Sequence, residues 1–491
     1  MIEYAMSLDE RPGAGGLPWL RRLLPPFLRG GARISPRDFP GFDAEAYLRE
    51  NPDVAASGIP ALAHFAKEGW MEGRRLSPRL DARQYLTANA HVRHVLLDIQ
   101  RRRGALPPAV RGDERLRPGI LLVGYVEAGL GLGESSRGLA RALAQAGLPF
   151  AIHPYNLAVE DRFVGPFMPE RYDKAGRYEV TLFEANGDHL DAFLEQFGRR
   201  AQGSHRIFRT YWELAEAPRA WAPRLARFDE VWAPTRFVAE AFRHVFDGPI
   251  TVVPPAVSVE SAAAFGRAYF GLPAERFLFL FTFDYNSIVA RKNPAGLAEA
   301  FRAAFPAPDD GVGLVLKSIG PPSLCPASRA ALLRAAREDP RIVVLEETLS
   351  RDEILSLARV CDGYASLHRS EGFGFGMAEA LGLGRPVIGT DYSGCTDFLD
   401  EETGFPVPCR LRPLRDGEYP YGDGQSWAEP DLAAATAILR RVREDRAGRE
   451  ARAEAGRRRM EERFGARAVG RIAAERLRSL LAEREGRNPP G

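Results

Sequence analysis

The chain has 491 residues, of which 45% are apolar and 27% charged, as in soluble globular proteins with more than one domain. The 67 Lys and Arg residues nearly balance 65 Asp and Glu residues, and the net charge of +2 argues against a nucleic-acid partner. The four cysteines form no C-x-x-C pair, and no apolar run approaches the roughly 20 residues that cross a bilayer. We therefore expect a cytoplasmic protein without a disulfide framework, a zinc site or a membrane span.

The N-terminal part of the sequence predicts a leader and a small module. Residues 1–40 are rich in Gly, Pro and Arg, which indicates a flexible leader. Within it, WLRRLLPPFLR at 19–29 is either a segment without fixed structure, which we favour, or a peripheral contact with the inner face of the cell membrane. At 41–100 a weak repeat, FDAEAYLREN followed by LDARQYLTAN, predicts a helical module whose role the sequence leaves open.

From residue 118 onwards, apolar runs alternate with amphipathic helices. Continuous runs such as GILLVGYV at 119–126 are typical of strands buried on both faces of a parallel sheet. We expect an α/β fold with two Rossmann-like domains facing a cleft, at 118–257 and 265–462, and a C-terminal helix at 463–485 that packs back on the first domain. Because ligands bind at the carboxyl ends of parallel strands, the loops at 129–133 and 372–376 are both placed to face that cleft.

The segment from His368 to Thr390 is the most informative stretch. Glu371 and Glu379 lie eight residues apart, the first in a Gly-Phe-Gly-Phe-Gly turn and the second in a helix. Closely spaced glycines before a helix let backbone amides approach an anion, while flanking carboxylates accept hydrogen bonds from sugar hydroxyls. This pattern predicts a nucleotide-sugar pocket, and the alternative is that both glutamates merely cap a solvated helix.

Four segments carry a family resemblance: GLGLGESSRGLARAL at 129–143, FDYNSIVARKNPAGLAEAF at 283–301, GYASLHRS at 363–370 and SEGFGFGMAEALGLGRPVIGT at 370–390. Together they resemble the retaining GT-B glycosyltransferases of family 4. The resemblance implies that Glu371 contacts the donor sugar and Glu379 the ribose. It further implies that two loops approach the donor diphosphate, with the residues Gly131, Gly133, Gly372, Phe373, Gly374 and Phe375.

Arg291 and Lys292 directly precede a predicted helix. Two cations there would neutralise a diphosphate whose charge grows during transfer, although an exposed Arg-Lys pair is also common on solvated surfaces. Members of the resembled family place an arginine five residues before the lysine, where this chain has Ser287. Whether Arg291 replaces that missing arginine is left open by the sequence.

Polar residues after two predicted strands are candidates for the acceptor side. Glu184, Asn186 and Asp188 follow an apolar strand, and His153 ends another. Such groups at strand ends can hold or deprotonate an acceptor hydroxyl, but any one of them is more often a packing or surface residue.

Several functions are disfavoured because their motifs are missing. No D-x-D, H-E-x-x-H, G-x-S-x-G or G-x-x-x-x-G-K-[ST] sequence occurs, and the loop at 129–133 does not fit G-x-G-x-x-G. Together with the family resemblance, which implies retention, we expect a metal-independent, cofactor-free transfer of a hexose from a nucleotide diphosphate sugar to a glycan or lipid-linked hydroxyl acceptor. The alternatives are a non-catalytic nucleotide-sugar-binding partner of a transferase and a GT-B epimerase.

Overall fold

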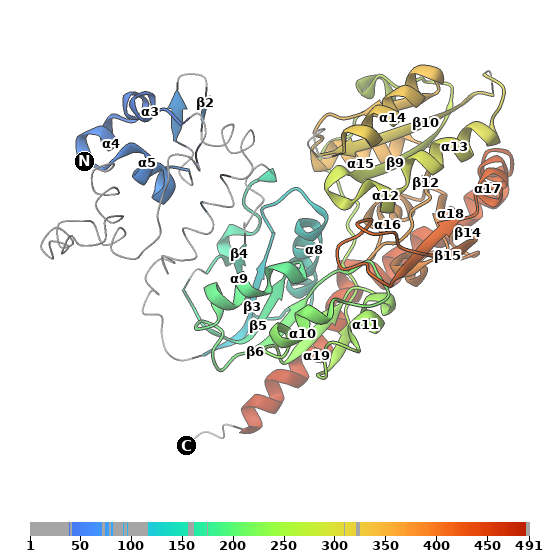
Figure 1. The fold of residues 1–491 in the computed structure, drawn as a ribbon. Helices are drawn as coiled ribbons and strands as arrows, with labels where there is room; N and C mark the ends of the chain where they lie inside the picture. Colours follow the sequence, from blue (N-terminus) through green and yellow to red (C-terminus); the bar gives the residue numbers. More distant parts are fainter. Residues whose placement is uncertain are drawn as a thin grey trace, which may run out of the picture. The chain divides into compact units, whose positions relative to one another are not determined.

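The computed structural model describes residues 39, 42–70, 74–77, 80–81, 92, 96, 116–155, 162–173, 175–308, 310–320 and 325–487. Residues 19–29, most of the second repeat copy and the linker before residue 116 lie outside this set. The chain divides into two compact units, residues 1–112 and 113–491 (Figure 1). No helix of the described residues is long and apolar enough to cross a membrane.

The first unit contains short helices around an aromatic core. Its elements are α3 (Ala44–Glu50), α4 (Pro52–Ser57), α5 (Ala61–His64), the π-helix η3 (Phe65–Gly69) and the antiparallel strands β1 (Arg75–Ser77) and β2 (Leu80–Asp81). Tyr47, Phe65 and Trp70 are buried, and the Tyr47 hydroxyl lies 2.9 Å from Nδ1 of His64. Asp43 caps α3 by accepting hydrogen bonds from two backbone amides of the first turn.

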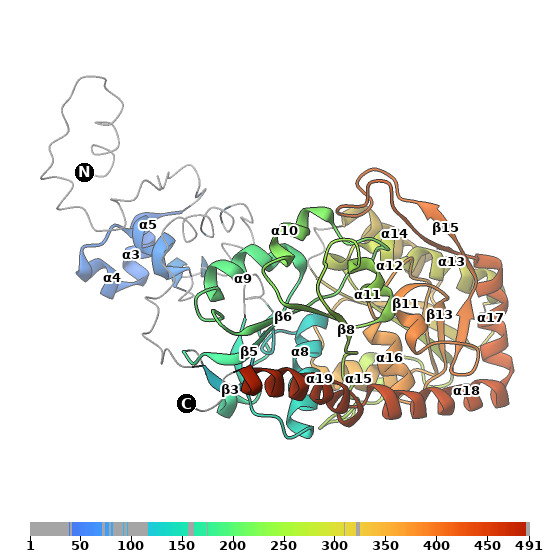
Figure 2. The same ribbon diagram turned by 90° about the horizontal axis from the view of Figure 1, so that it is seen from below.

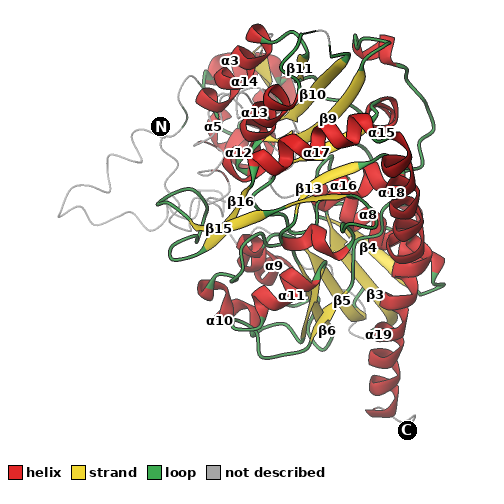
Figure 3. Ribbon diagram, turned by 90° about the vertical axis from the view of Figure 1, so that its right-hand side faces the viewer, coloured by secondary structure: helices red, strands yellow, loops and turns green. Residues whose placement is uncertain are grey.

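The second unit contains two parallel six-stranded sheets, which confirms the predicted pair of Rossmann-like domains (Figure 3). The strand order of the first sheet is β4-β3-β5-β6-β7-β8. Its strands are β3 (Arg117–Gly124), β4 (Phe150–Pro154), β5 (Tyr178–Glu184), β6 (His205–Arg209), β7 (Glu230–Ala233) and β8 (Ile250–Val252). The connecting helices are α8 (Gly131–Gln145), η5 (Pro169–Arg171), η6 (Gly187–His189), α9 (Leu190–Phe197), η7 (Arg219–Trp221), α10 (Ala222–Leu225) and α11 (Arg236–Phe242).

The strand order of the second sheet is β11-β10-β9-β12-β13-β14. Its strands are β9 (Phe277–Asp284), β10 (Val312–Ile319), β11 (Ile342–Leu345), β12 (Gly363–Ser366), β13 (Val387–Thr390) and β14 (Phe405–Val407). The helix η8 (Arg267–Phe270) precedes β9. The helices between the strands are η9 (Tyr285–Ser287), α12 (Val289–Lys292), α13 (Pro294–Ala304), α14 (Pro326–Glu338), α15 (Arg351–Val360), α16 (Phe375–Gly382) and η11 (Ser393–Asp397). The strands are mostly buried, as continuous apolar runs require.

Two further features follow the second sheet. Strands β15 (Cys409–Pro413) and β16 (Ser426–Pro430) form an antiparallel hairpin, and we call residues 409–430 the arm. The chain then continues through α17 (Leu432–Glu444), α18 (Arg446–Arg459), the π-helix η12 (Met460–Phe464) and α19 (Ala466–Arg487). Helix α19 lies against α8, where Val469, Ala473 and Leu477 join the core of the first sheet domain (Figure 2).

In both sheets the strand order reverses beside the first strand. After β3 the chain continues to β4 on one side and returns to β5 on the other, and β9 is likewise followed by β10 and β11 before the return to β12. Loops that leave the carboxyl ends of strands at such a reversal point diverge and leave a crevice for a ligand.

Candidate functional site

A cavity of about 1190 Å³ lies at both reversal points. Its lining residues come mainly from the loops after strands of both sheets, among them β3, β5, β6, β9, β11 and β12, and from the first turns of α8 and α16. Of the residues singled out from the sequence, those lining it are Gly131, Asn186, Asp188, Ser287, Arg291, Lys292, Glu371, Gly372, Phe373, Gly374, Phe375 and Glu379. Gly133, Glu184 and His153 do not line it.

Glu371 is held by two cations. Its carboxylate accepts a hydrogen bond from Lys292 Nζ, and its Oε2 lies 3.1 Å from Nη1 of Arg291. Burial alone would raise the pKa of Glu371, but the charges of Lys292 and Arg291 outweigh that effect and lower the pKa to about 2. Glu371 is therefore ionised at neutral pH, so it can accept hydrogen bonds but cannot serve as a proton donor.

Arg291 is fixed by several partners at once. Its guanidinium donates to the carbonyl oxygens of Ser287 at 3.2 Å and Ser370 at 2.7 Å, and it lies 3.8 Å from the Glu213 carboxylate. Only 5% of its side chain is exposed. Arg291 therefore lies one helical turn from Ser287, inside the cavity, and is not part of a solvated surface.

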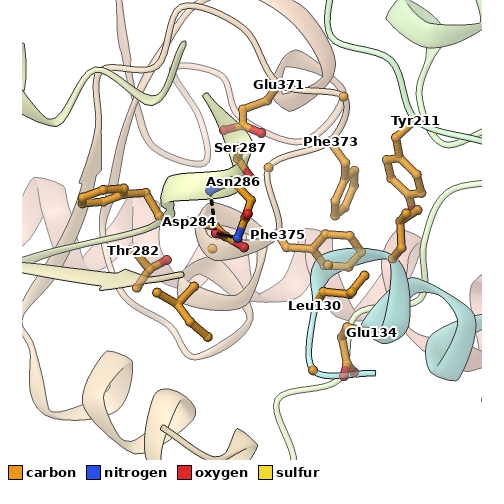
Figure 4. Close-up of a pocket in the computed structure, with 18 of the residues that line it drawn as sticks. Leu130, Glu134, Tyr211, Thr282, Asp284, Asn286, Ser287, Glu371, Phe373 and Phe375 are labelled. Atoms are coloured by element: carbon orange, nitrogen blue, oxygen red, sulfur yellow. Dashed lines mark hydrogen bonds between the residues drawn. The ribbon is translucent and has the colours of Figure 1, made fainter. Parts of the chain in front are cut away.

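The glycine turn after β12 ends at the N-terminus of α16. Gly374 precedes the helix with a φ of 100°, a conformation that glycine adopts at little cost. The Phe373 side chain is buried against Phe398 and Phe464, so this residue offers the cavity mainly its backbone. Figure 4 shows the Phe375 ring beside Tyr211, and their centroids are 6.2 Å apart.

The first glycine loop makes two different contributions. Helix α8 begins at Gly131, which faces α16: a Cβ on Gly131 would lie 3.9 Å from the Phe375 ring. Gly133 lies one half-turn further on, where a Cβ would come within 2.0 Å of the Ala128 carbonyl oxygen. The geometry thus explains Gly133 by close backbone packing and places only Gly131 at the cavity.

Glu379 on α16 is paired with an arginine that the sequence reading missed. Arg351 Nη1 lies 2.5 Å from Oε1 of Glu379, and its Nη2 lies 3.9 Å from Oε1 of Glu134 on α8. Burial raises the pKa of Glu379, and Arg351 opposes that rise. A sequence signal existed: Ser350 and Glu353 form a capping box, which places Arg351 in the first turn of a helix that follows a strand.

The acceptor-side predictions fall into two groups. Asp188 and Asn186 line the cavity, and Asp188 accepts hydrogen bonds from the Tyr421 hydroxyl at 2.8 Å and Trp221 Nε1 at 3.3 Å. Glu184 instead points into the first sheet domain, where it is fully buried and bonded to Arg209, Ser135 and Ser136. Its partners use both carboxylate oxygens, so its position gives no support to an acceptor role.

His153 is also directed away from the cavity. Its Nδ1 lies 2.8 Å from Nη1 of Arg200, and its ring packs edge-on against Phe197 with centroids 4.8 Å apart. These contacts are those of a packing residue, and they give no support to an acceptor role for His153 either.

The arm contributes groups that the sequence reading did not identify. Tyr419 lines the cavity, and its hydroxyl donates to Glu213 at 2.6 Å. Gln425 exchanges two hydrogen bonds with the backbone of Glu216, at 3.0 and 3.1 Å. Because Trp427 of the arm packs into the core of the first sheet domain, the arm connects the two sheet domains on the side of Asp188.

A buried histidine beneath Glu371 gives a testable pH effect. His368 has no exposed surface, Ser366 Oγ lies 3.1 Å from its Nδ1, and burial lowers its pKa to about 4. In the unfolded chain the imidazole is protonated as the pH falls below its usual pKa of 6.5. In the folded protein it stays neutral until the pH falls to its lowered pKa of about 4. Stability contributed by the neutral His368 is therefore complete above about pH 6.5 and is lost as the pH falls towards 4.

We expect the free energy of unfolding to fall by about 2 kcal/mol between pH 7 and pH 5 through this group. In the H368Q variant that part of the pH dependence should be absent, whatever the variant's stability at pH 7. Urea unfolding of both proteins at the two pH values measures this difference. An equal change in the free energy of unfolding between pH 7 and pH 5 in both proteins would contradict the role of His368.

Among the described residues, no group of three or more His, Cys, Asp or Glu side chains is placed to hold a metal ion. The cations that pair with Glu371 at this cavity are Arg291 and Lys292.

Comparison with known proteins gives one matching family and several solved structures of similar fold. Residues 290–472 match the family described as Family 4 Glycosyltransferase in conflict systems, a range that includes Arg291, Lys292, Glu371 and Glu379. No curated protein matches the chain.

The chain is similar in fold to sucrose-phosphate synthase from Thermosynechococcus elongatus, with 18% identity, a TM-score of 0.56 and coverage of 75% of this chain and 100% of that chain. It is also similar to α,α-trehalose 6-phosphate synthase from Burkholderia multivorans, with 13% identity, a TM-score of 0.54 and coverage of 77% and 99%. A third similar structure is HepE from Anabaena in complex with UDP and glucose, with 15% identity, a TM-score of 0.52 and coverage of 73% and 99%. The family match supports the resemblance to family 4 over residues 290–472, and the structural matches confirm the GT-B fold.

Proposed function

We propose, from the confirmed resemblance to the GT-B glycosyltransferases of family 4, that this chain transfers a hexose from a nucleotide diphosphate sugar to a hydroxyl acceptor. The observation that carries the proposal is the cluster of Glu371, Lys292 and Arg291 at the N-terminus of α16, inside a cavity formed at the reversal points of both sheets. A cationic cluster with backbone amides beside it suits a diphosphate, and the adjoining carboxylate suits sugar hydroxyls.

The charges suggest how the donor is bound and cleaved. Lys292, Arg291 and the amides at the start of α16 would stabilise the negative charge that grows on the diphosphate as the glycosidic bond breaks. Because Arg291 lies inside the cavity, it would supply the positive charge that family members carry at the position of Ser287. Glu371 would accept hydrogen bonds from the hexose and Glu379 from the ribose, with Gly131 and Gly372 to Phe375 along the diphosphate.

Transfer with retention and without a metal ion agrees with the groups present. The leaving phosphate can take the acceptor proton, so the mechanism requires no strong protein base. Lys292 and Arg291 can neutralise the charge of the diphosphate, as a divalent ion does in metal-dependent transferases. With Glu371 ionised and His368 neutral and buried, neither is placed as a general acid for the leaving group.

The acceptor would enter beside Asp188 and Asn186, between the first sheet domain and the arm. We propose a glycan or a lipid-linked glycan as its class, since carboxylate and amide groups there can bind sugar hydroxyls. A lipid-linked acceptor would bring the protein to the inner face of the cell membrane, where residues 19–29 supply apolar and basic groups.

A panel of nucleotide sugars tests the proposal. We expect one donor among UDP-, GDP- and ADP-linked hexoses to raise the melting temperature, because a ligand that binds only the folded state stabilises it by mass action. The same donor should release free nucleoside diphosphate in the presence of EDTA, by slow hydrolysis even without an acceptor.

The outcomes separate the proposal from its rivals. Binding without release of nucleoside diphosphate would favour a non-catalytic binding partner, and interconversion of the sugar would favour an epimerase. The absence of both binding and turnover for every donor would contradict the proposed function.

A further inference from the structure

A row of alternating charges crosses the cavity from one sheet domain to the other. Glu379 on α16 pairs with Arg351 on α15 at 2.5 Å, and Arg351 lies 3.9 Å from Glu134 on α8. Glu134 in turn pairs with Arg137 and Arg141 of its own helix, each at 3.0 Å. The first two residues belong to the second sheet domain and the others to the first, so the row spans the interface.

Arg351 also contacts the segment that joins the two domains. Its Nη2 donates a hydrogen bond of 2.7 Å to the carbonyl oxygen of Ser258, which lies between β8 and η8. One guanidinium thus touches the ribose-binding carboxylate, the connection between the domains and, at longer range, the first domain. Its side chain is 34% exposed, so it has room to change partners.

A buried carboxylate such as Glu379 needs a cation to remain ionised and able to accept two hydrogen bonds from a diol. Arg351 is the cation that opposes the effect of burial on Glu379. Arg351 also acts on Glu134, whose side chain is 9% exposed: although burial raises the pKa of Glu134, Arg351 together with Arg137 and Arg141 holds it below its usual range. A change at Glu379 is therefore felt at Glu134 through a single side chain.

We propose that Arg351 and Glu134 are positioning residues that couple the binding of the nucleoside ribose at Glu379 to the closure of the two domains. The inference rests on the proposed function, because it takes the ribose as the ligand of Glu379. If the domains separate, the contact between Arg351 and Glu134 is lost, so a ligand that fixes Arg351 favours the closed arrangement. By thermodynamic linkage, an intact Arg351–Glu134 contact must equally favour nucleotide binding.

The same row predicts a pH signature. The groups that act on Glu379 are Arg351 from α15, Glu134 from α8 and the phenol of Tyr364 from β12. Since only the ionised carboxylate accepts both ribose hydrogens, nucleotide binding weakens as the pH falls through the pKa of Glu379. Removing the Arg351 charge moves that loss to higher pH, whereas removing the Glu134 charge moves it to lower pH.

Titration calorimetry with UDP, GDP and ADP, from pH 5.5 to 8, provides the test on the full chain. For the nucleotide that binds the wild type, we expect E134Q and R351M each to weaken affinity by about 10-fold at pH 7.5. When E134Q is added to R351M, it should weaken nucleotide affinity little further. The R351K variant should bind the nucleotide more tightly than R351M does. The pH at which nucleotide affinity is half lost should be lower in E134Q than in the wild type and higher in R351M.

Matched controls break exposed pairs elsewhere: E338Q, whose carboxylate pairs with Arg302 at 3.3 Å, and R446M, which breaks the pair with Glu450 at 2.7 Å. Both should bind the nucleotide as the wild type does, and melting curves show whether each variant is folded. If the wild type binds but E134Q binds equally well, or if the two losses simply add, the coupling is overturned and the proposed function stands. If the wild type binds none of the three nucleotides, the proposed function fails and the coupling fails with it.

Discussion

The E371Q variant is expected to lose at least about 100-fold in turnover number, because glutamine cannot provide the negative charge that faces the hexose and the two cations. Glutamine has the same shape and still accepts a hydrogen bond from Lys292, so the cavity should keep its form. Nucleoside diphosphate release from the donor found in the panel, followed by chromatography, measures the loss.

The matched control is E401Q, which removes an exposed carboxylate in the turn before β14 and should leave turnover unchanged. Nucleoside diphosphate binding to E371Q should stay within a few-fold of wild type, since the sugar is absent from that ligand. Full turnover in a folded E371Q variant would remove Glu371 from the catalytic site.

The R209M variant is expected to lower the free energy of unfolding by about 3–5 kcal/mol, the cost of leaving one charge of a buried pair without its partner. Arg209 and Glu184 are both fully buried, and Arg209 also donates to Ser135 at 2.5 Å and to the Val253 carbonyl at 3.2 Å. Urea unfolding at pH 7 measures the change.

The double variant E184M/R209M should regain much of that loss, because two apolar side chains of similar volume replace the whole pair. R243M, which breaks the exposed pair with Glu240, is the control and should change stability by less than about 1 kcal/mol. A double variant no more stable than R209M would show that the surrounding hydroxyl groups, rather than the charge pair, determine the cost.

The sheets were predictable because buried parallel strands leave continuous apolar runs in the sequence. The apolar run expected as a strand at 119–126 overlaps β3 (Arg117–Gly124), and from residue 118 onwards strands and helices alternate as expected. Strand β14 and the arm were missed: β15 is largely exposed and reads as CRLRP, and the hairpin is held by contacts with residues about 200 positions away, such as Glu213 and Glu216. No local pattern encodes such contacts.

Which residues line the cavity was predictable where one segment supplies them, and unpredictable where two distant segments meet. Glu371 and Glu379 lie on one loop and helix, and the structure places both at the cavity. Arg351 and Glu134 are 217 positions apart, and only the folded chain brings them together. Glu184 and Asp188 looked equivalent in sequence, but Glu184 ends β5 facing the core, whereas Asp188 lies in the turn beyond it.

The central claim is that the cavity at the two reversal points binds a nucleotide diphosphate sugar between Glu371 and Glu379. A crystal structure of E371Q with the intact donor tests this most directly. We predict the diphosphate against Lys292, Arg291 and the N-terminus of α16, the ribose within hydrogen-bonding distance of Glu379, and the hexose beside residue 371. A donor bound elsewhere, or one whose ribose does not reach Glu379, would contradict the account.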